Sequence, residues 1–133
     1  MCSIAASIKP LCMSKIERFE ELKCWQAARS LVKESFIVAS EGALARDFDT
    51  RSQFKRAALS SMNNIAEGFG RFSDKEFIRF LDTAQSSVQE VESMLYVFED
   101  LSYLPLDKIN LLRSKATNTK SLILGLIKYL RNK

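Results

Sequence analysis

The chain has 133 residues, of which 47% are apolar and 27% charged, and its formal net charge is +4 at pH 7. With only four Gly and two Pro, this composition favours one folded domain of a few long helices and excludes a chain that is disordered throughout. There is no histidine, and Cys2, Cys12 and Cys24 are too widely spaced for a zinc site, so no metal, cofactor or histidine-based catalysis is expected.

The first fifteen residues are predicted to stand apart from the rest. Their one apolar run, Ile4 to Ile8, is too short for a signal peptide or a membrane span, so no membrane partner is expected. We predict that residues 1–15 are a disordered tail, with Met13 as an alternative start to Met1, and that residues 16–133 form one domain. The odd number of cysteines favours reduced thiols in a cytoplasmic protein over a disulfide framework.

A helical period begins at Phe19, and steps of three or four residues predict a first helix over about residues 20–41, closed by Gly42. A second helix is predicted over about residues 51–68. For its N-cap the sequence offers Asp49 or Thr50.

The end of the second helix is predicted from two glycines. Gly68 and Gly70 lie at the end of the helical pattern, and one of them is expected to adopt the left-handed conformation that commonly ends a helix.

The third and fourth helices show the clearest pattern, because apolar residues repeat every seven positions along both, as in a helical bundle. Ser73 and Glu76 form a capping box before the third helix, and Pro105 ends it. The two series of the third helix are Phe77, Ala84, Val91 and Phe98, and Leu81, Val88 and Leu95. Those of the fourth are Ile109, Ala116, Ile123 and Leu130, and Leu112, Thr119 and Leu126. The predicted fold is all-α, an antiparallel up-down-up-down four-helix bundle.

The second predicted helix contains polar residues that are poor helix formers at its centre. Asn64 and Glu67 lie one turn apart on it, and Ser87 and Glu90 lie one turn apart on the third helix. Together with Ser60 they predict a buried polar network that fixes the register of two neighbouring helices. The alternative is that Glu67 and Glu90 form a catalytic or metal-binding carboxylate pair, which the absence of histidine disfavours.

Charge is distributed unevenly between the last two helices. From residue 73 to 104 there are seven acids against two bases, and from residue 105 to the end there are seven bases against one acid. One interpretation is that the two helices are neighbours whose charges offset each other. The other is that bases of the second and fourth helices form one surface for nucleic-acid phosphate. The candidate residues of that surface are Arg51, Lys55, Arg56, Arg113, Lys120, Lys128 and Arg131.

The side of the fourth helix remote from its apolar stripe is small and polar, with Leu111, Leu122 and Tyr129 along its border. Such a face suits packing against a second protomer, and a solvated surface is the alternative.

The sequence resembles the four helix bundle protein family encoded by intervening sequences of bacterial 23S ribosomal RNA genes. It is also similar to the accessory variability protein of diversity-generating retroelements. The pieces that carry the resemblance are Phe19–Leu22, Trp25–Ala28, Arg56–Ala58, Ser60, Asn64–Gly68, Arg71, Ser73, Glu76–Phe77, Phe80–Leu81, Ala84, Ser87 and Glu90.

This resemblance implies a four-helix bundle that assembles into a ring, commonly a pentamer. It implies RNA or DNA and a reverse transcriptase or other nucleic-acid-processing protein as partners, and it supplies no catalytic residues. For most relatives it assigns no biochemical role. The preferred function is a non-enzymatic oligomer that binds nucleic acid through its bases, and the alternative is a purely structural scaffold for protein interactions.

Overall fold

The computed structural model describes residues 16–133, so the predicted tail, residues 1–15, and the choice between Met1 and Met13 lie outside the described residues. The described part is all-α, with four α-helices, two short 3₁₀ turns and no strand. In chain order these are η1 (Phe19–Glu21), α2 (Lys23–Ala39), η2 (Leu44–Arg46), α3 (Phe48–Phe69), α4 (Asp74–Asp100) and α5 (Leu106–Arg131).

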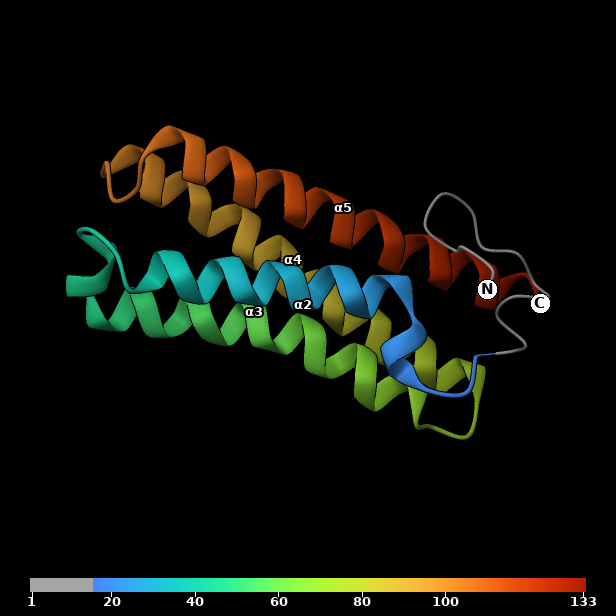
Figure 1. The fold of residues 1–133 in the computed structure, drawn as a ribbon. Coiled ribbons are helices and arrows are strands. Elements are labelled where there is room, and N and C mark those ends of the chain that lie inside the picture. Colours follow the sequence, from blue (N-terminus) through green and yellow to red (C-terminus); the bar gives the residue numbers. More distant parts are fainter. Residues whose placement is uncertain (1–15) are drawn as a thin grey trace.

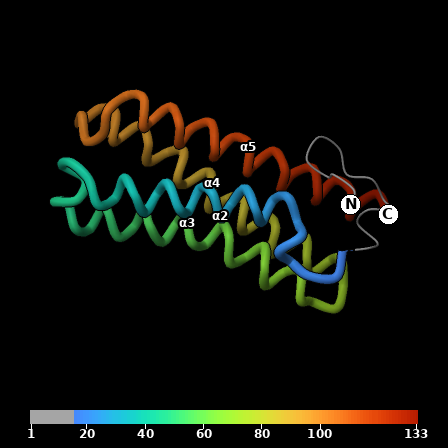
Figure 2. Tube along the Cα trace, in the orientation of Figure 1, coloured from blue at the N-terminus to red at the C-terminus, as the bar shows by residue number. Residues whose placement is uncertain are grey.

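The four α-helices lie side by side as a four-helix bundle (Figure 1). The loops from α2 to α3 and from α4 to α5 lie at one end of the molecule, and the loop from α3 to α4 lies at the other. Figure 2 traces the same path, in which the chain reverses direction at each loop. The helix α3 packs chiefly against α2 and α4, and α5 packs chiefly against α4 and α2, so α3 and α5 lie diagonally across the bundle.

The seven-residue series of the last two helices face the core. Every member of the α4 series and of the α5 series is buried, which confirms the predicted apolar stripes. Thr119 is the polar member of the α5 series, and its hydroxyl donates to the Lys115 carbonyl at 2.7 Å. Hydrogen bonding within its own helix therefore lets this residue occupy a core position.

The first two helices begin and end at different residues from those predicted. Leu22 is extended, with ψ of 128°, and separates η1 from α2, which ends at Ala39. The N-cap of α3 is Asp47 rather than Asp49 or Thr50, and its carboxylate accepts the Thr50 backbone N–H at 3.2 Å. Because the 3₁₀ turn η2 leads directly into this cap, α3 begins about one turn earlier than the apolar pattern indicates.

Neither glycine at the end of α3 adopts a left-handed conformation, so that prediction was wrong. Gly70 is the C-cap, with φ of −81°, and Gly68 is a buried residue in the last turn of α3. A Cβ atom at Gly68 would lie 2.6 Å from the Phe80 Cβ and 2.9 Å from the Phe77 ring. Gly68 therefore allows the end of α3 to approach the start of α4 closely.

At the opposite end a hydrogen bond joins two loops. The Tyr103 hydroxyl, between α4 and α5, donates to the Asp47 carboxylate at 2.7 Å, so Asp47 both caps α3 and anchors the α4–α5 loop. Gly42 lies beside it with φ of +58°, where a Cβ would meet the Tyr103 carbonyl oxygen at 3.1 Å. Glycine suits this position because a side chain would be strained at this φ and would crowd the Tyr103 carbonyl.

Among the described residues, no helix combines the length and the apolar character that crossing a membrane requires.

Candidate nucleic-acid interface

Four of the predicted nucleic-acid-binding bases lie along one helix, α5, and we call them the α5 edge: Arg113, Lys120, Lys128 and Arg131. Eighteen residues separate the first from the last, which corresponds to about 27 Å of helix. The structure places α4 directly beside this helix, so the surroundings of each base depend on the α4 residue opposite it.

Arg113 is held by two residues of α4. Its guanidinium group donates to the Glu99 carboxylate at 2.6 Å and lies 4.6 Å from the centre of the Tyr96 ring. The hydrogen bond to Glu99 raises the pKa of Arg113 above its ordinary value. Arg113 is thus a paired base.

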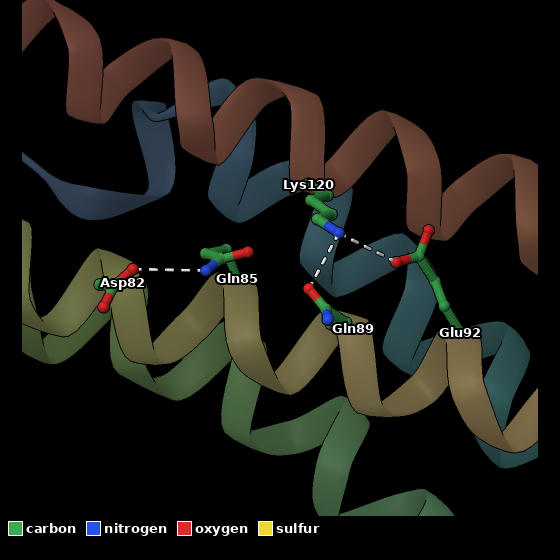
Figure 3. Close-up of polar contacts among 5 residues, drawn as sticks. All are labelled: Asp82, Gln85, Gln89, Glu92 and Lys120. Atoms are coloured by element: carbon green, nitrogen blue, oxygen red, sulfur yellow. Dashed lines mark hydrogen bonds and ion pairs between the residues drawn. The ribbon is translucent and has the colours of Figure 1, made fainter.

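Lys120 is also paired with α4, as Figure 3 shows. Its ammonium group contacts the Gln89 side-chain oxygen at 3.1 Å and the Glu92 carboxylate at 3.4 Å. Both members of the Lys120–Glu92 pair keep 28% of their side-chain surface exposed, so solvent and ions still reach them. Asp82, nearer the start of α4, instead accepts a hydrogen bond from the Gln85 side chain at 3.3 Å.

The remaining two bases of the α5 edge, Lys128 and Arg131, are exposed. Among residues 16–133, neither has an acidic side chain within ion-pair distance. Lys133, just beyond the helix, pairs with Asp74 at 3.1 Å. The last turn of α5 therefore carries the open positive charge of this edge, in keeping with the favourable position of bases at a helix C-terminus.

The three predicted bases of α3 do not join the α5 edge, because α3 and α5 are diagonal in the bundle. Arg51 donates to the Ala45 carbonyl at 3.0 Å and covers the Phe48 ring, so it ties α3 to the preceding turn. The Lys55 ammonium lies 4.6 Å from the centre of the Phe36 ring. Of these three bases of α3, Arg51 and Lys55 are half-buried and Arg56 alone is exposed. The expectation of one continuous basic surface is therefore not met.

The polar residues at the centre of α3 and α4 meet in part. The hydroxyl groups of Ser60 and Ser87 lie 2.8 Å apart and link the two helices. The Asn64 side-chain amide donates to the carbonyl and the hydroxyl of Ser60, and Ser87 donates to the Thr83 carbonyl at 3.0 Å. These groups satisfy one another within the protein, as a contact that fixes helix register requires.

The two glutamates lie outside this contact. Glu67 is exposed and forms a long ion pair with Arg71 at 3.8 Å, and Glu90 is exposed and accepts from Gln53 at 3.0 Å. The chain reverses direction between α3 and α4, so Glu67 and Glu90 diverge from the Ser60–Ser87 contact in opposite directions, by about 15 Å in total. They cannot act as a carboxylate pair.

One feature of the surface escaped the sequence patterns. Arg71 and Arg79 help line a groove of about 640 Å³ at the junction of α3 and α4, together with Asn64 and the acids Glu76 and Asp82. Only their proximity in the fold reveals this set, because the residues belong to two helices and a loop. Its charges balance, which distinguishes it from the open end of the α5 edge.

The outer face of α5 keeps apolar residues in contact with solvent. Leu111 is 40% exposed and Leu124 is 45% exposed. Between them, a shallow groove of about 580 Å³ is lined by Arg113 and by four small polar residues, Ser114, Thr117, Asn118 and Ser121. No metal-binding group of three or more Cys, Asp or Glu side chains occurs in the part of the chain that the structure describes.

Comparison with known proteins gives one family. No curated protein matches the chain. The model of the 23S rRNA-intervening sequence protein family matches residues 20–125, which include all four α-helices apart from the last residues of α5. Since this match covers most of the sequence, the chain belongs to the 23S rRNA-intervening sequence protein family.

Proposed function

We propose that this chain is a non-enzymatic, oligomeric four-helix bundle that binds nucleic acid through the α5 edge. The observation that carries the proposal is the open end of that edge, where Lys128 and Arg131 are exposed and have no acidic partner among the described residues. A phosphate backbone is recognised chiefly by such accessible cations, and the chain's net charge of +4 favours the approach of a polyanion.

The finer features of the proposal concern assembly and setting. The helices follow an up-down-up-down order, and copies of the bundle form a ring. The family resemblance favours a pentameric ring. The protein acts in the cytoplasm. The exposed Leu111 and Leu124 on the outer face of α5 support association, because apolar side chains in such positions commonly pack against another protomer. A nucleic-acid-processing enzyme such as a reverse transcriptase is the protein partner that suits this setting.

The test measures binding of fluorescein-labelled 24-nucleotide RNA and 24-base-pair DNA, both of mixed sequence, by fluorescence anisotropy at 25–200 mM KCl. We expect affinity for at least one probe to fall steeply with salt. Charge reversal in K128E/R131E should abolish binding. The matched control is K33E/R46E, which reverses two exposed bases of α2 and η2.

Two results would contradict this function. One is the absence of any salt-dependent binding of RNA or DNA by the wild-type protein at 25 mM KCl. The other is equal loss of affinity in K128E/R131E and K33E/R46E, which would mean that net charge alone matters.

A second function, a scaffold for protein interactions without nucleic acid, is favoured by the pairing of Arg113 with Glu99 and of Lys120 with Glu92. In this case the charges serve helix pairing and solubility. Light scattering and the 260-to-280-nm absorbance ratio of the purified protein separate the two functions. An oligomer free of nucleic acid that binds neither probe at low salt fits the scaffold.

A further inference from the structure

We propose that the acidic side chains of α4 limit nucleic-acid binding from within the chain, because Glu92 and Glu99 occupy Lys120 and Arg113 in place of phosphate. This inference rests on the proposed binding at the α5 edge. It assigns Glu92 and Glu99 as positioning residues that determine how many bases of that edge engage a phosphate backbone.

The geometry provides a carboxylate for each of the two inner bases. Glu99 accepts a hydrogen bond from Arg113 at 2.6 Å, and Glu92 lies 3.4 Å from the Lys120 ammonium. Figure 3 shows the contact between Lys120 and Glu92. A carboxylate oxygen is the same kind of acceptor for these donors as a phosphate oxygen. In each pair the position that a phosphate would take is therefore already filled.

The two outer bases are in a different situation. Lys128 and Arg131 are exposed and have no acidic partner among residues 16–133. Along one helix edge, the half nearer the N-terminus is thus neutralised and the half nearer the C-terminus is open. The edge presents two available bases instead of four.

Opening an exposed ion pair costs little, because such pairs contribute only about two- to five-fold to an equilibrium constant. The displaced carboxylate, however, remains close to the incoming phosphate and repels it. Removing the negative charge from Glu92 and Glu99 removes both the competition and the repulsion. The variant E92Q/E99Q keeps the size and hydrogen-bonding oxygen of each side chain, so it isolates the charge.

The salt dependence of binding counts the bases that take part. On duplex DNA each phosphate contact adds about 0.9 to the negative slope of log K against log salt, so two contacts give a slope of about −2 and four give about −4. For E92Q/E99Q we expect this change in slope on the 24-base-pair DNA, together with affinity at least ten-fold higher at 50 mM KCl.

Two further variants test the origin of the gain. The control E41Q/D49N removes two exposed carboxylates near the α2–α3 loop, and it raises the net charge equally. Its slope should stay at the wild-type value. In the E92Q/E99Q background, changing Arg113 and Lys120 to glutamine should return the slope to about −2, whereas R113Q/K120Q alone should change it little.

Each outcome is informative. If the wild type binds and E92Q/E99Q has the same affinity and slope, this inference fails and the proposed function stands. If E41Q/D49N gains as much as E92Q/E99Q, the effect belongs to net charge and the inference also fails. If neither the wild type nor E92Q/E99Q binds RNA or DNA, the proposed function and the inference fail together.

Discussion

At the scale of single residues, Ser35 is the least satisfied polar group of the described core. It is fully buried in α2, and its hydroxyl has no hydrogen-bond partner among residues 16–133. Ser61, equally buried in α3, donates to the Ala58 carbonyl at 2.7 Å. The two serines therefore differ in hydrogen bonding while sharing the same burial.

We expect S35A to raise the free energy of unfolding by about 1 kcal/mol, because an unsatisfied buried hydroxyl costs about 1–3 kcal/mol and alanine is the better helix former. Urea denaturation measures the change. The control S61A removes a satisfied hydroxyl and should gain less or lose stability. Equal gains in both variants would mean that helix propensity alone is responsible.

A second residue-scale prediction concerns the Asp47–Tyr103 hydrogen bond. The Tyr103 hydroxyl lowers the pKa of Asp47, so the stabilisation is present above the unfolded pKa of about 3.9 and is lost as the pH falls through the lower folded value. The same bond raises the pKa of Tyr103, so stabilisation is present below about pH 10 and is lost as the pH rises through the folded value.

Replacing Tyr103 with phenylalanine should therefore reduce the dependence of stability on pH in both windows. Urea midpoints from pH 2 to 6 and from pH 9 to 11 report it. Y96F is the control, since Tyr96 keeps its ring under Arg113 without contacting Asp47. A Y103F profile that parallels the wild-type profile would refute the coupling.

At the scale of helices, two glycines have opposite surroundings. Gly68 is enclosed by Phe77 and Phe80, whereas a Cβ at Gly125, on the exposed side of α5, would meet no atom within 4 Å. Both lie within α-helices, Gly68 in the last turn of α3 and Gly125 inside α5, and glycine inside a helix is less favourable than alanine by about 1 kcal/mol. Any difference between their alanine variants therefore reports the contact between α3 and α4.

We expect G68A to destabilise the fold by about 1–3 kcal/mol, because the added methyl group forces α3 and α4 apart, and G125A to stabilise it by about 0.5–1 kcal/mol. Thermal and urea unfolding of both variants test this. Stabilisation by G68A would show that the start of α4 shifts without cost.

Sequence patterns predicted these helices unevenly. The apolar series of α4 and α5 predicted their buried faces because a seven-residue repeat depends on helix geometry alone. The cap of α3 was missed since Asp47, Asp49 and Thr50 are all good capping residues, and only the turn before them selects one. Gly68 was misread because its role depends on residues across the helix contact.

The polar stretch shows the same limit. Helix spacing alone grouped Asn64 with Glu67 and Ser87 with Glu90. Which pairs meet depends on the direction of the neighbouring helix, and the reversed direction of α4 brings Ser60 to Ser87 while separating the glutamates. Likewise, the sequence could not show that the bases of α3 and those of α5 lie on separate surfaces, because this depends on the diagonal arrangement of the two helices.

At the scale of the whole molecule, the seam between α4 and α5 is a line of exposed or half-exposed ion pairs. Arg113–Glu99, Lys120–Glu92 and Lys133–Asp74 follow one another along the bundle. Pairs of this kind stabilise a fold little, and salt screens them. The buried apolar stripes provide most of the stability.

Raising KCl from 50 to 500 mM should therefore change the free energy of unfolding by less than about 1 kcal/mol, while nucleic-acid binding is lost. Urea unfolding at both salt concentrations measures the first effect, and anisotropy measures the second. A large loss of folding stability in salt would contradict this separation and would assign the ion pairs a structural role.

The burial of Cys24 in α2 has a practical consequence. Burial raises the pKa of its thiol to about 12, so about one molecule in 10⁵ carries the reactive thiolate at neutral pH. In a chain whose Cys2 and Cys12 are changed to serine, modification by a maleimide reagent would have to await opening of the bundle. The rate of labelling then measures how often the bundle opens, and the probe is the Cys24 thiol that the protein already contains.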